Sequence, residues 1–136
     1  MNDNTTHTPS GATYGGVRWL LRAEGLVFLL LTCAGYAQWG NLSWWWFAAL
    51  FLLPDLAFFG YAINARIGAM CYNATHSTIG PAAFLAWAVV QGNNTALSLA
   101  LIWWAHIGFD RALGYGLKYT QGFGFTHLGR IGKKQV

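Results

Sequence analysis

Two histidines and two aspartates are the residues of this chain best suited to chemistry. His106 and Asp110 are four residues apart, so a helix would place them on one face, one turn above the other. Asp55 and His76 lie in two other apolar stretches. Neutral imidazole nitrogens and carboxylate oxygens are the usual ligands of Zn, and of Fe or Mn where further oxygens join. We therefore predict a site for Zn or another divalent metal, formed by Asp55, His76, His106 and Asp110.

Other polar residues fall at a similar predicted depth in the apolar stretches, and we assign them supporting roles. A metal in such a site could activate a water molecule to attack a substrate that enters from the cytoplasmic leaflet. The candidate catalytic residues are Glu24, as a general base, and Arg111. The candidate substrate-binding residues are Arg22, Tyr72, Asn73 and His127.

The same residues also fit a purely structural role. No compact metal signature such as His-Glu-x-x-His occurs in the sequence. Ion pairs of Arg22 with Glu24 or Asp55, and of Arg111 with Asp110, would fix the packing of helices, with each histidine donating to a neighbouring carboxylate. The sequence leaves this network open beside the metal site.

Two other functions also remain open. Ionisable groups near the middle of a bilayer, next to Pro54 and Pro81, are ingredients of a proton relay or a transport path. A transporter of this size would need to form a homo-dimer. The alternative is an accessory subunit of a larger membrane complex, in which His106 would ligate a haem or chlorophyll-type pigment.

The composition is that of an integral membrane protein. Hydrophobic residues make up 55% of the 136 residues, aromatic residues 17% and charged residues only 9%, whereas soluble domains carry roughly 25% charged residues. Helices satisfy their own backbone polar groups in lipid, and no alternating pattern indicates a barrel. The two cysteines lie in apolar stretches and indicate no disulfide framework.

We predict an all-α, polytopic fold with four transmembrane helices in an antiparallel bundle. The transmembrane domain covers residues 17–119 and follows a polar, disordered cytoplasmic tail, residues 1–16. The predicted helices are residues 17–39, 44–63, 67–90 and 95–119, with kinks at Pro54-Asp55 and Gly80-Pro81.

Residues 120–136 form a predicted interfacial cytoplasmic tail in which glycines and aromatics alternate with cations. We expect this tail and the residues just before it to lie along the lipid headgroups, with four aromatic side chains inserted and the basic residues on anionic lipid. Those aromatic residues are Tyr115, Tyr119, Phe123 and Phe125. The alternative is that Thr126 and His127 fold back over the cytoplasmic mouth of the polar site.

The cations predict the topology. All eight Lys and Arg residues fall in the amino-terminal region, the second interhelical link, or the end of the fourth helix and its tail. With four crossings, the positive-inside rule places both termini in the cytoplasm. Because topology accounts for the net charge of +4, we expect membrane lipids as partners and no nucleic acid.

Several runs of the sequence together carry a family resemblance. They are Leu20-Leu21-Arg22-Ala23-Glu24-Gly25, Pro54-Asp55, Arg66-Ile67-Gly68-Ala69, Tyr72-Asn73 with His76, Gly80-Pro81, Ala105-His106-Ile107-Gly108 with Asp110-Arg111, Gly114-Tyr115-Gly116-Leu117-Lys118-Tyr119, and Thr126-His127-Leu128-Gly129-Arg130-Ile131-Gly132. The chain resembles, over roughly residues 18 to 132, a small bacterial four-helix membrane family catalogued as domain of unknown function 4260. The resemblance implies a multi-pass protein of the bacterial inner membrane and no particular activity.

Overall fold

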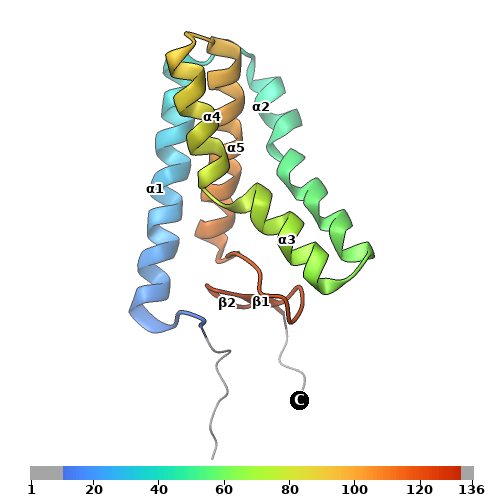
Figure 1. The fold of residues 1–136 in the computed structure, drawn as a ribbon. Helices are drawn as coiled ribbons and strands as arrows, with labels where there is room; N and C mark the ends of the chain where they lie inside the picture. The colour runs from blue at the N-terminus through green and yellow to red at the C-terminus, as the bar shows by residue number, and fades with distance from the viewer. Residues whose placement is uncertain (1–10, 133–136) are drawn as a thin grey trace, which may run out of the picture.

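The chain is almost wholly helical in the computed structural model, which describes residues 11–132 (Figure 1). The predicted helical class is therefore confirmed. The α-helices are α1 (Gly15–Trp39), α2 (Trp44–Phe51), α3 (Ala65–His76), α4 (Ile79–Val90) and α5 (Asn94–Leu113), and η1 (Leu53–Ala62) is a 3-10 helix. Strands β1 (Phe125–Thr126) and β2 (Gly129–Arg130) form a small antiparallel hairpin.

Two helical segments are long and apolar enough to cross a membrane. They are Gly15–Trp39, with 25 residues, and Trp44–Ala62, with 19 residues, which joins α2 to η1. Of the predicted tails, residues 1–10 and 133–136 lie outside the described residues. The described part of the amino-terminal segment is bonded to the rest of the protein, because both the backbone N–H and the hydroxyl of Thr13 donate to the His127 carbonyl, at 2.8 and 3.0 Å.

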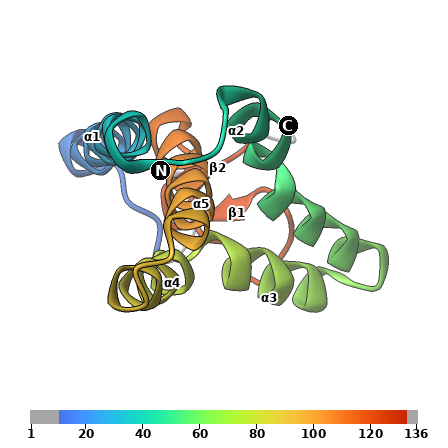
Figure 2. The same ribbon diagram turned by 90° about the horizontal axis from the view of Figure 1, so that it is seen from above.

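Helix α5 lies at the centre of the fold and supplies more buried residues than any other helix or strand (Figure 2). Helices α1 and α4 pack along it, and α2 contacts its upper part, whereas α3 and η1 lie side by side and diverge from the bundle (Figures 1 and 2). One side of α5 can therefore present side chains to α3 and η1 together.

Glycines allow α1 and α5 to approach closely. A Cβ atom on Gly108 would lie 2.7 Å from the Leu29 backbone nitrogen and 2.9 Å from the Gly25 carbonyl oxygen. A Cβ atom on Gly25 would collide with the Cβ atom of Arg111. Small residues at such a crossing are typical of helices that associate within a bilayer, where close van der Waals contact drives packing.

The second predicted helix is interrupted at Pro54-Asp55, as the sequence indicates. Helix α2 ends at Phe51, and Pro54 lies in the first turn of η1, where its missing N–H leaves no helical bond broken. The chain continues beyond the proline as a 3-10 helix, which the sequence analysis did not predict. Asp55 is thereby held in the first turn of a new helix.

The third predicted helix, residues 67–90, is in fact two helices, so the prediction of one kinked helix is wrong. The break falls at Ser77, whose extended backbone (φ −78°, ψ 148°) ends α3, and not at Gly80-Pro81. Pro81 lies in the first turn of α4, a position that tolerates proline. The break turns α3 away from α4 (Figure 1).

The fourth predicted helix ends earlier than residue 119. Gly114 has φ 92° and closes α5 with a left-handed C-cap, a conformation that glycine adopts without strain. The residues that follow turn back under the helices.

The headgroup strap predicted for residues 115–132 is a folded layer instead. Lys118, Thr126 and Leu128 are buried, and the Phe123 ring packs edge-on against Tyr61 at 5.5 Å. Asn73 fixes the layer to α3, since its side chain accepts from the Lys118 N–H at 2.7 Å and donates to the Lys118 carbonyl at 2.8 Å. The protein itself therefore supplies hydrogen-bond partners for the backbone of this layer, as at Lys118.

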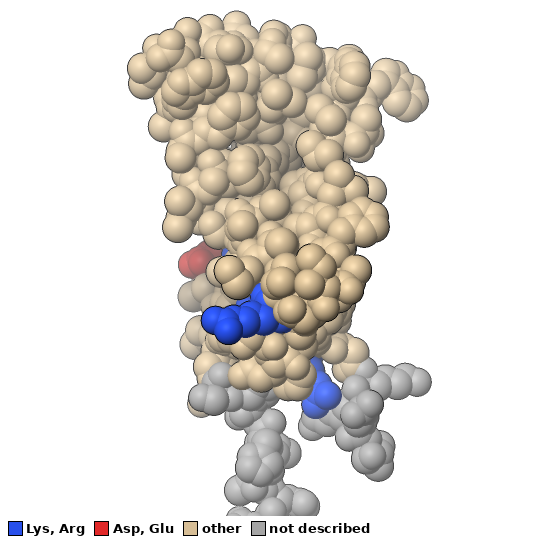
Figure 3. All heavy atoms as spheres, turned by 45° about the vertical axis from the view of Figure 1, so that its right-hand side comes forward, with Lys and Arg blue, Asp and Glu red and all other residues tan. Residues whose placement is uncertain are grey.

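Charged side chains gather at one end of the molecule. On the face drawn in Figure 3, Lys and Arg lie toward the end that carries the termini, and the opposite end shows no charge. Trp45 and Val90, near the opposite end, are 85% and 80% exposed.

We predict that Gly108→Ala destabilises the protein, because the added methyl group would meet the backbone of α1, which cannot move without displacing the helix. Overpacking of this kind costs about 1–3 kcal/mol in the free energy of unfolding. The thermal midpoint in mild detergent should fall accordingly. Gly16→Ala is the matched control, since nothing lies within 4 Å of its Cβ position; equal midpoints for the two variants would contradict the close contact.

Candidate metal centre

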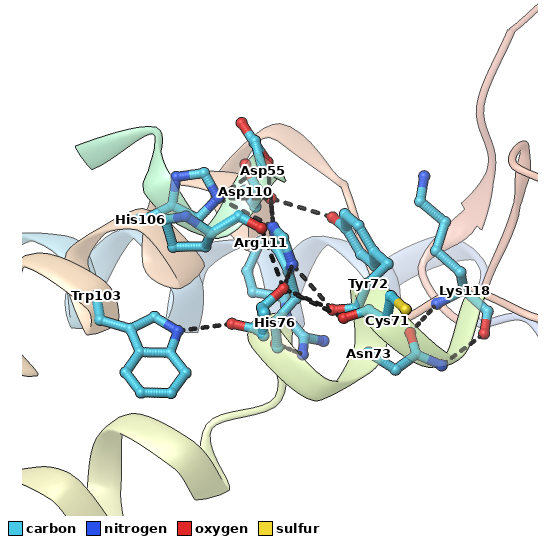
Figure 4. A network of polar contacts seen from close by, with 12 residues as sticks. Asp55, Cys71, Tyr72, Asn73, His76, Trp103, His106, Asp110, Arg111 and Lys118 are labelled. Carbon is cyan, nitrogen blue, oxygen red and sulfur yellow. Dashed lines mark hydrogen bonds and ion pairs between the residues drawn. The ribbon is translucent and has the colours of Figure 1, made fainter. Parts of the chain in front are cut away.

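Asp55, His76, His106 and Asp110 converge on one point between η1, α3 and α5 (Figure 4). The two Nε2 atoms lie 3.0 Å apart. His76 Nε2 is 3.2 Å from Asp55 Oδ1 and 3.3 Å from Asp110 Oδ2, and His106 Nε2 is 3.3 Å and 3.5 Å from the same two oxygens. We call these four residues the ligand cluster.

Five of the six separations among the four atoms are close to those of a tetrahedral metal site. Ligands at 2.0–2.1 Å from a central Zn²⁺ would be separated by about 3.3–3.4 Å along each edge of the tetrahedron. Five edges of the ligand cluster measure 3.0–3.5 Å, and the sixth, between the two carboxylates, is below 4.8 Å. A buried Asp/His/His/Asp group of this kind could hold a metal ion.

The hydrogen bonds of His76 fix which nitrogen faces the cluster. Its Nδ1 lies 2.9 Å from the Tyr72 carbonyl oxygen and 2.8 Å from the Thr75 hydroxyl. A carbonyl only accepts, so Nδ1 carries the proton of the neutral ring and Nε2 presents a lone pair to the cluster. That lone pair faces two carboxylate oxygens, a repulsive arrangement that a cation at the centre would reverse.

His106 is held by packing more than by hydrogen bonds. Its side chain is 1% exposed, and its ring contacts the edge of Phe51 at 5.3 Å between centroids. Within residues 11–132, Nδ1 has no hydrogen-bond partner. The position of Nε2 therefore depends on α5, which carries His106 and Asp110 one turn apart.

A shell of further contacts holds the ligands in place. The Tyr72 hydroxyl donates to Asp110 Oδ2 at 3.1 Å, and its ring stacks on His76 at 3.7 Å between centroids. Trp103 Nε1 donates to the Thr75 carbonyl at 2.6 Å. Outer-shell partners of this kind orient metal ligands and tune their basicity.

The ligand cluster is closed on most sides and open at Asp55. The side chains of His76, His106 and Asp110 are 3%, 1% and 12% exposed, whereas that of Asp55 is 30% exposed. Asp55 is therefore the most accessible member of the ligand cluster.

Two of the other predicted site residues contact this centre. Tyr72 binds Asp110, and Arg111 donates from Nη2 to the His76 carbonyl at 3.3 Å. Arg111 Nη1 also lies 2.8 Å from His127 Nε2. Arg111 thus connects the end of α3 to the hairpin layer and supports His76 through its backbone.

The remaining predicted site residues lie apart from the centre. Arg22 donates from Nε to the Ala112 carbonyl at 2.9 Å, with its guanidinium 4.5 Å above the Trp19 ring, so it fixes α1 against α5. Asn73 binds the Lys118 backbone. Glu24 is exposed on α1, where it lines a separate cavity of about 210 Å³.

His127 faces protein donors on both sides and is not aimed at the ligand cluster. Its Nδ1 lies 2.9 Å from the Leu117 backbone nitrogen, and its Nε2 faces Arg111. Burial lowers the pKa of His127, and the Arg111 charge lowers it further. His127 is therefore neutral near pH 7 and acts in the packing of the hairpin layer.

The arginine–carboxylate network that the sequence left open does not form. Among residues 11–132, every ion pair within 4.0 Å joins a histidine of the cluster to an aspartate of the cluster. The pairs expected for Arg22 with Glu24 or Asp55, and for Arg111 with Asp110, were wrong because both guanidiniums bind backbone carbonyls.

Sequence reasoning missed two residues of the site. Thr75 precedes His76, and neighbours in a helix do not share a face, so spacing gave no signal. The hydroxyl reaches the ring because Thr75 also bridges to η1, through the Pro54 carbonyl at 3.1 Å. Lys118 was interpreted only as a cation that sets topology, although the structure buries it.

We predict that Thr75→Val weakens zinc binding about 10- to 100-fold, the usual effect of removing an outer-shell partner. The valine keeps the volume of threonine but cannot hydrogen-bond His76 Nδ1 or the Pro54 carbonyl. Competition with a chromogenic chelator would measure the affinity. Thr120→Val is the control, since Thr120 is exposed in the loop before the hairpin; equal affinities of the two variants would show that Thr75 plays no part.

Comparisons with known proteins give a family but no activity. A family model described as Domain of unknown function (DUF4260) matches residues 18–131. No curated protein and no solved structure matches the chain. Since the matched region covers most of the 136 residues, the chain belongs to this family of unknown function, as its motifs indicate.

Proposed function

We propose that this protein is a metal-dependent membrane enzyme that catalyses a hydrolysis. The observation that carries the proposal is the ligand cluster: four donor atoms from three helices are spaced 3.0–3.5 Å apart along five edges of a tetrahedron. The metal would be Zn or another divalent ion with the same preference for imidazole and carboxylate.

With four protein ligands, a zinc ion would take the reacting water as a fifth ligand, a coordination number that catalytic zinc can reach. Bound zinc would supply a Lewis acid that makes water nucleophilic near neutral pH. Asp55 is the exposed ligand, which leaves room on its side for a water molecule and a substrate. The water oxygen would form the new bond to the substrate, the bond to the leaving group would break, and the two water protons would divide between the products.

The supporting residues keep the ligands in position during this reaction. Tyr72 donates to Asp110 and stacks on His76, so it holds two ligands at once. Arg111 holds the His76 backbone. Glu24 lies on α1, away from the cluster, and we do not retain it as the general base.

We further infer that the fold spans the bacterial inner membrane four times. The crossings would be α1, α2 with η1, α3 with α4, and α5, joined by short turns. Large hydrophobic side chains are exposed along all of them, among them Leu30, Phe59, Ile79 and Val90. An apolar surface of this extent is stable in lipid and not in water. The cations at the terminal end then favour cytoplasmic termini and a metal centre in the cytoplasmic half.

The first test is metal content. Elemental analysis of the purified protein should find one equivalent of zinc per chain. The His106→Gln variant should bind less than a tenth of that amount, because the ligand cluster loses a buried ligand. Asp55→Asn should weaken the affinity less, since Asp55 is the exposed ligand.

Glu24→Gln is the control for these variants, because it removes a carboxylate that lies outside the ligand cluster. It should retain full zinc content. Wild-type protein that binds no stoichiometric metal after zinc loading would refute the proposed function.

The second test is topology. A green fluorescent protein fused after Val136 should fluoresce in the bacterial cell, whereas alkaline phosphatase at the same position should be inactive, as expected for a cytoplasmic carboxyl terminus. An active phosphatase fusion would place this end, and the metal centre near it, on the opposite side of the membrane.

A further inference from the structure

We propose that Lys118 forms an anion-binding subsite beside the ligand cluster and that this subsite takes a phosphoryl group of the substrate. The inference rests on the proposed function and names its substrate class. Lys118 follows α5 in the layer that closes the terminal end of the bundle.

Lys118 is a buried lysine whose ammonium group is only partly satisfied. The residue is 4% exposed. Its Nζ donates to the Phe123 carbonyl at 2.9 Å and lies 3.7 Å from the centroid of the Phe123 ring. An ammonium group has three donors, and this is its one hydrogen bond among the described residues. Its other two donors have no oxygen or nitrogen acceptor among these residues, and the Phe123 and Tyr72 rings are their nearest recorded contacts.

The ammonium group lies next to the ligand cluster, with the Tyr72 ring between them (Figure 4). The Tyr72 hydroxyl binds Asp110, and Lys118 Nζ lies 4.8 Å from the centroid of the same ring. Within residues 11–132, Lys118 forms no ion pair within 4.0 Å. A cation is thus held close to two carboxylates and paired with neither.

Lys118 is charged at neutral pH in spite of its burial. Burial lowers the pKa of Lys118 to about 8, and the negative charges of Asp110 and Asp55 act in the opposite direction. The two carboxylates are thus near enough to influence the ammonium group. At pH 7 the group keeps its proton and can donate to an anion.

With a divalent metal bound to the ligand cluster, the charges around it would favour a ligand that carries two negative charges. A divalent metal would cancel the charges of Asp55 and Asp110 and leave Lys118 and Arg111 as two surplus cations. Glu24 is the only other carboxylate among the described residues, and it is exposed on α1. A phosphoryl monoester carries close to two negative charges at pH 7. It matches this surplus, whereas a carboxylate carries only one charge.

A purely structural role does not explain the ammonium group. The bonds to Asn73 use the Lys118 backbone, which any residue but proline would supply. Between the Tyr72 and Phe123 rings, an apolar side chain would pack without the cost of burying a charge. One carbonyl and two aromatic rings offset only part of this cost, which favours a ligand for the charge.

Two sources could supply the phosphoryl group: a soluble phosphate ester or a lipid headgroup. An apolar groove of about 310 Å³ includes Pro54 and Thr75 in its lining, and these two residues precede Asp55 and His76 in the sequence. This groove would take the chain of a lipid substrate, and a soluble ester would leave it empty.

The test measures phosphate binding to the zinc-loaded protein in a maltoside detergent. Calorimetry should detect binding of inorganic phosphate to the wild type. Lys118→Met should bind it about 10- to 100-fold more weakly, the range expected for the loss of one charge-assisted hydrogen bond, with its zinc content unchanged. Lys118→Arg, which restores a cation, should recover most of the affinity.

Arg66→Met is the matched control, since it removes an exposed cation from the first turn of α3 and should bind phosphate as the wild type does. Zinc-loaded wild type that binds no phosphate would overturn the inference, whatever the variants do. So would a Lys118→Met variant as tight as the wild type. Either result would leave zinc binding, and with it the proposed function, intact.

The source is resolved by two further titrations of the loaded wild type. Glycerol phosphate in detergent represents the soluble ester, and phosphatidic acid in phosphatidylcholine nanodiscs represents the lipid. Tighter binding of phosphatidic acid would assign the subsite to a membrane-borne phosphate, and tighter binding of glycerol phosphate would assign it to a soluble one. Loss of both ligands in Lys118→Met supports the subsite in either case.

Discussion

The convergence of two imidazole nitrogens and two carboxylate oxygens on one point is the constraint on which the rest of this structure depends. Two imidazole nitrogens and two carboxylate oxygens lie within 4.8 Å of one another. The His76 nitrogen in this group has no proton to offer, because its ring proton is committed to Nδ1. A lone pair that faces two carboxylate oxygens is unfavourable in a low-dielectric interior. A proton on His106 Nε2, or a cation among the four atoms, would offset this repulsion.

The irregular parts of the helices are what bring these atoms together. If Ala65 to Val90 were one straight helix, α3 would continue along α5 and could not lean outward to meet η1. The break at Ser77 and the 3-10 turn that begins at Leu53 place His76 and Asp55 opposite α5. The long regular helices α1 and α5 pack closely through glycines and form a rigid frame. The shorter segments η1 and α3 supply the other two members of the ligand cluster, Asp55 and His76.

The sequence predicted the convergence of Asp55, His76, His106 and Asp110 better than it predicted their surroundings, for a physical reason. Ionisable residues in apolar stretches must face a protein interior, and the spacing of His106 and Asp110 fixes a shared helix face. Depth along a helix, in contrast, does not give the rotation of that helix. Glu24 has a depth similar to the cluster but faces outward on α1. The fold of residues 115–132 was predicted least well. It depends on hydrogen bonds from Asn73 and Thr13, and hydrophobic periodicity does not predict contacts between residues so far apart in the sequence.

The bond between Thr13 and His127 joins positions 114 residues apart, at the two ends of the chain. A ribosome makes His127 only after all of the described helices, so the layer beneath the ligand cluster can close only after those helices have been made. An ion would therefore have an interval in which to reach the cluster before the segment at Thr13 binds the hairpin. Filling of the site would then depend on the order in which the polypeptide is synthesised.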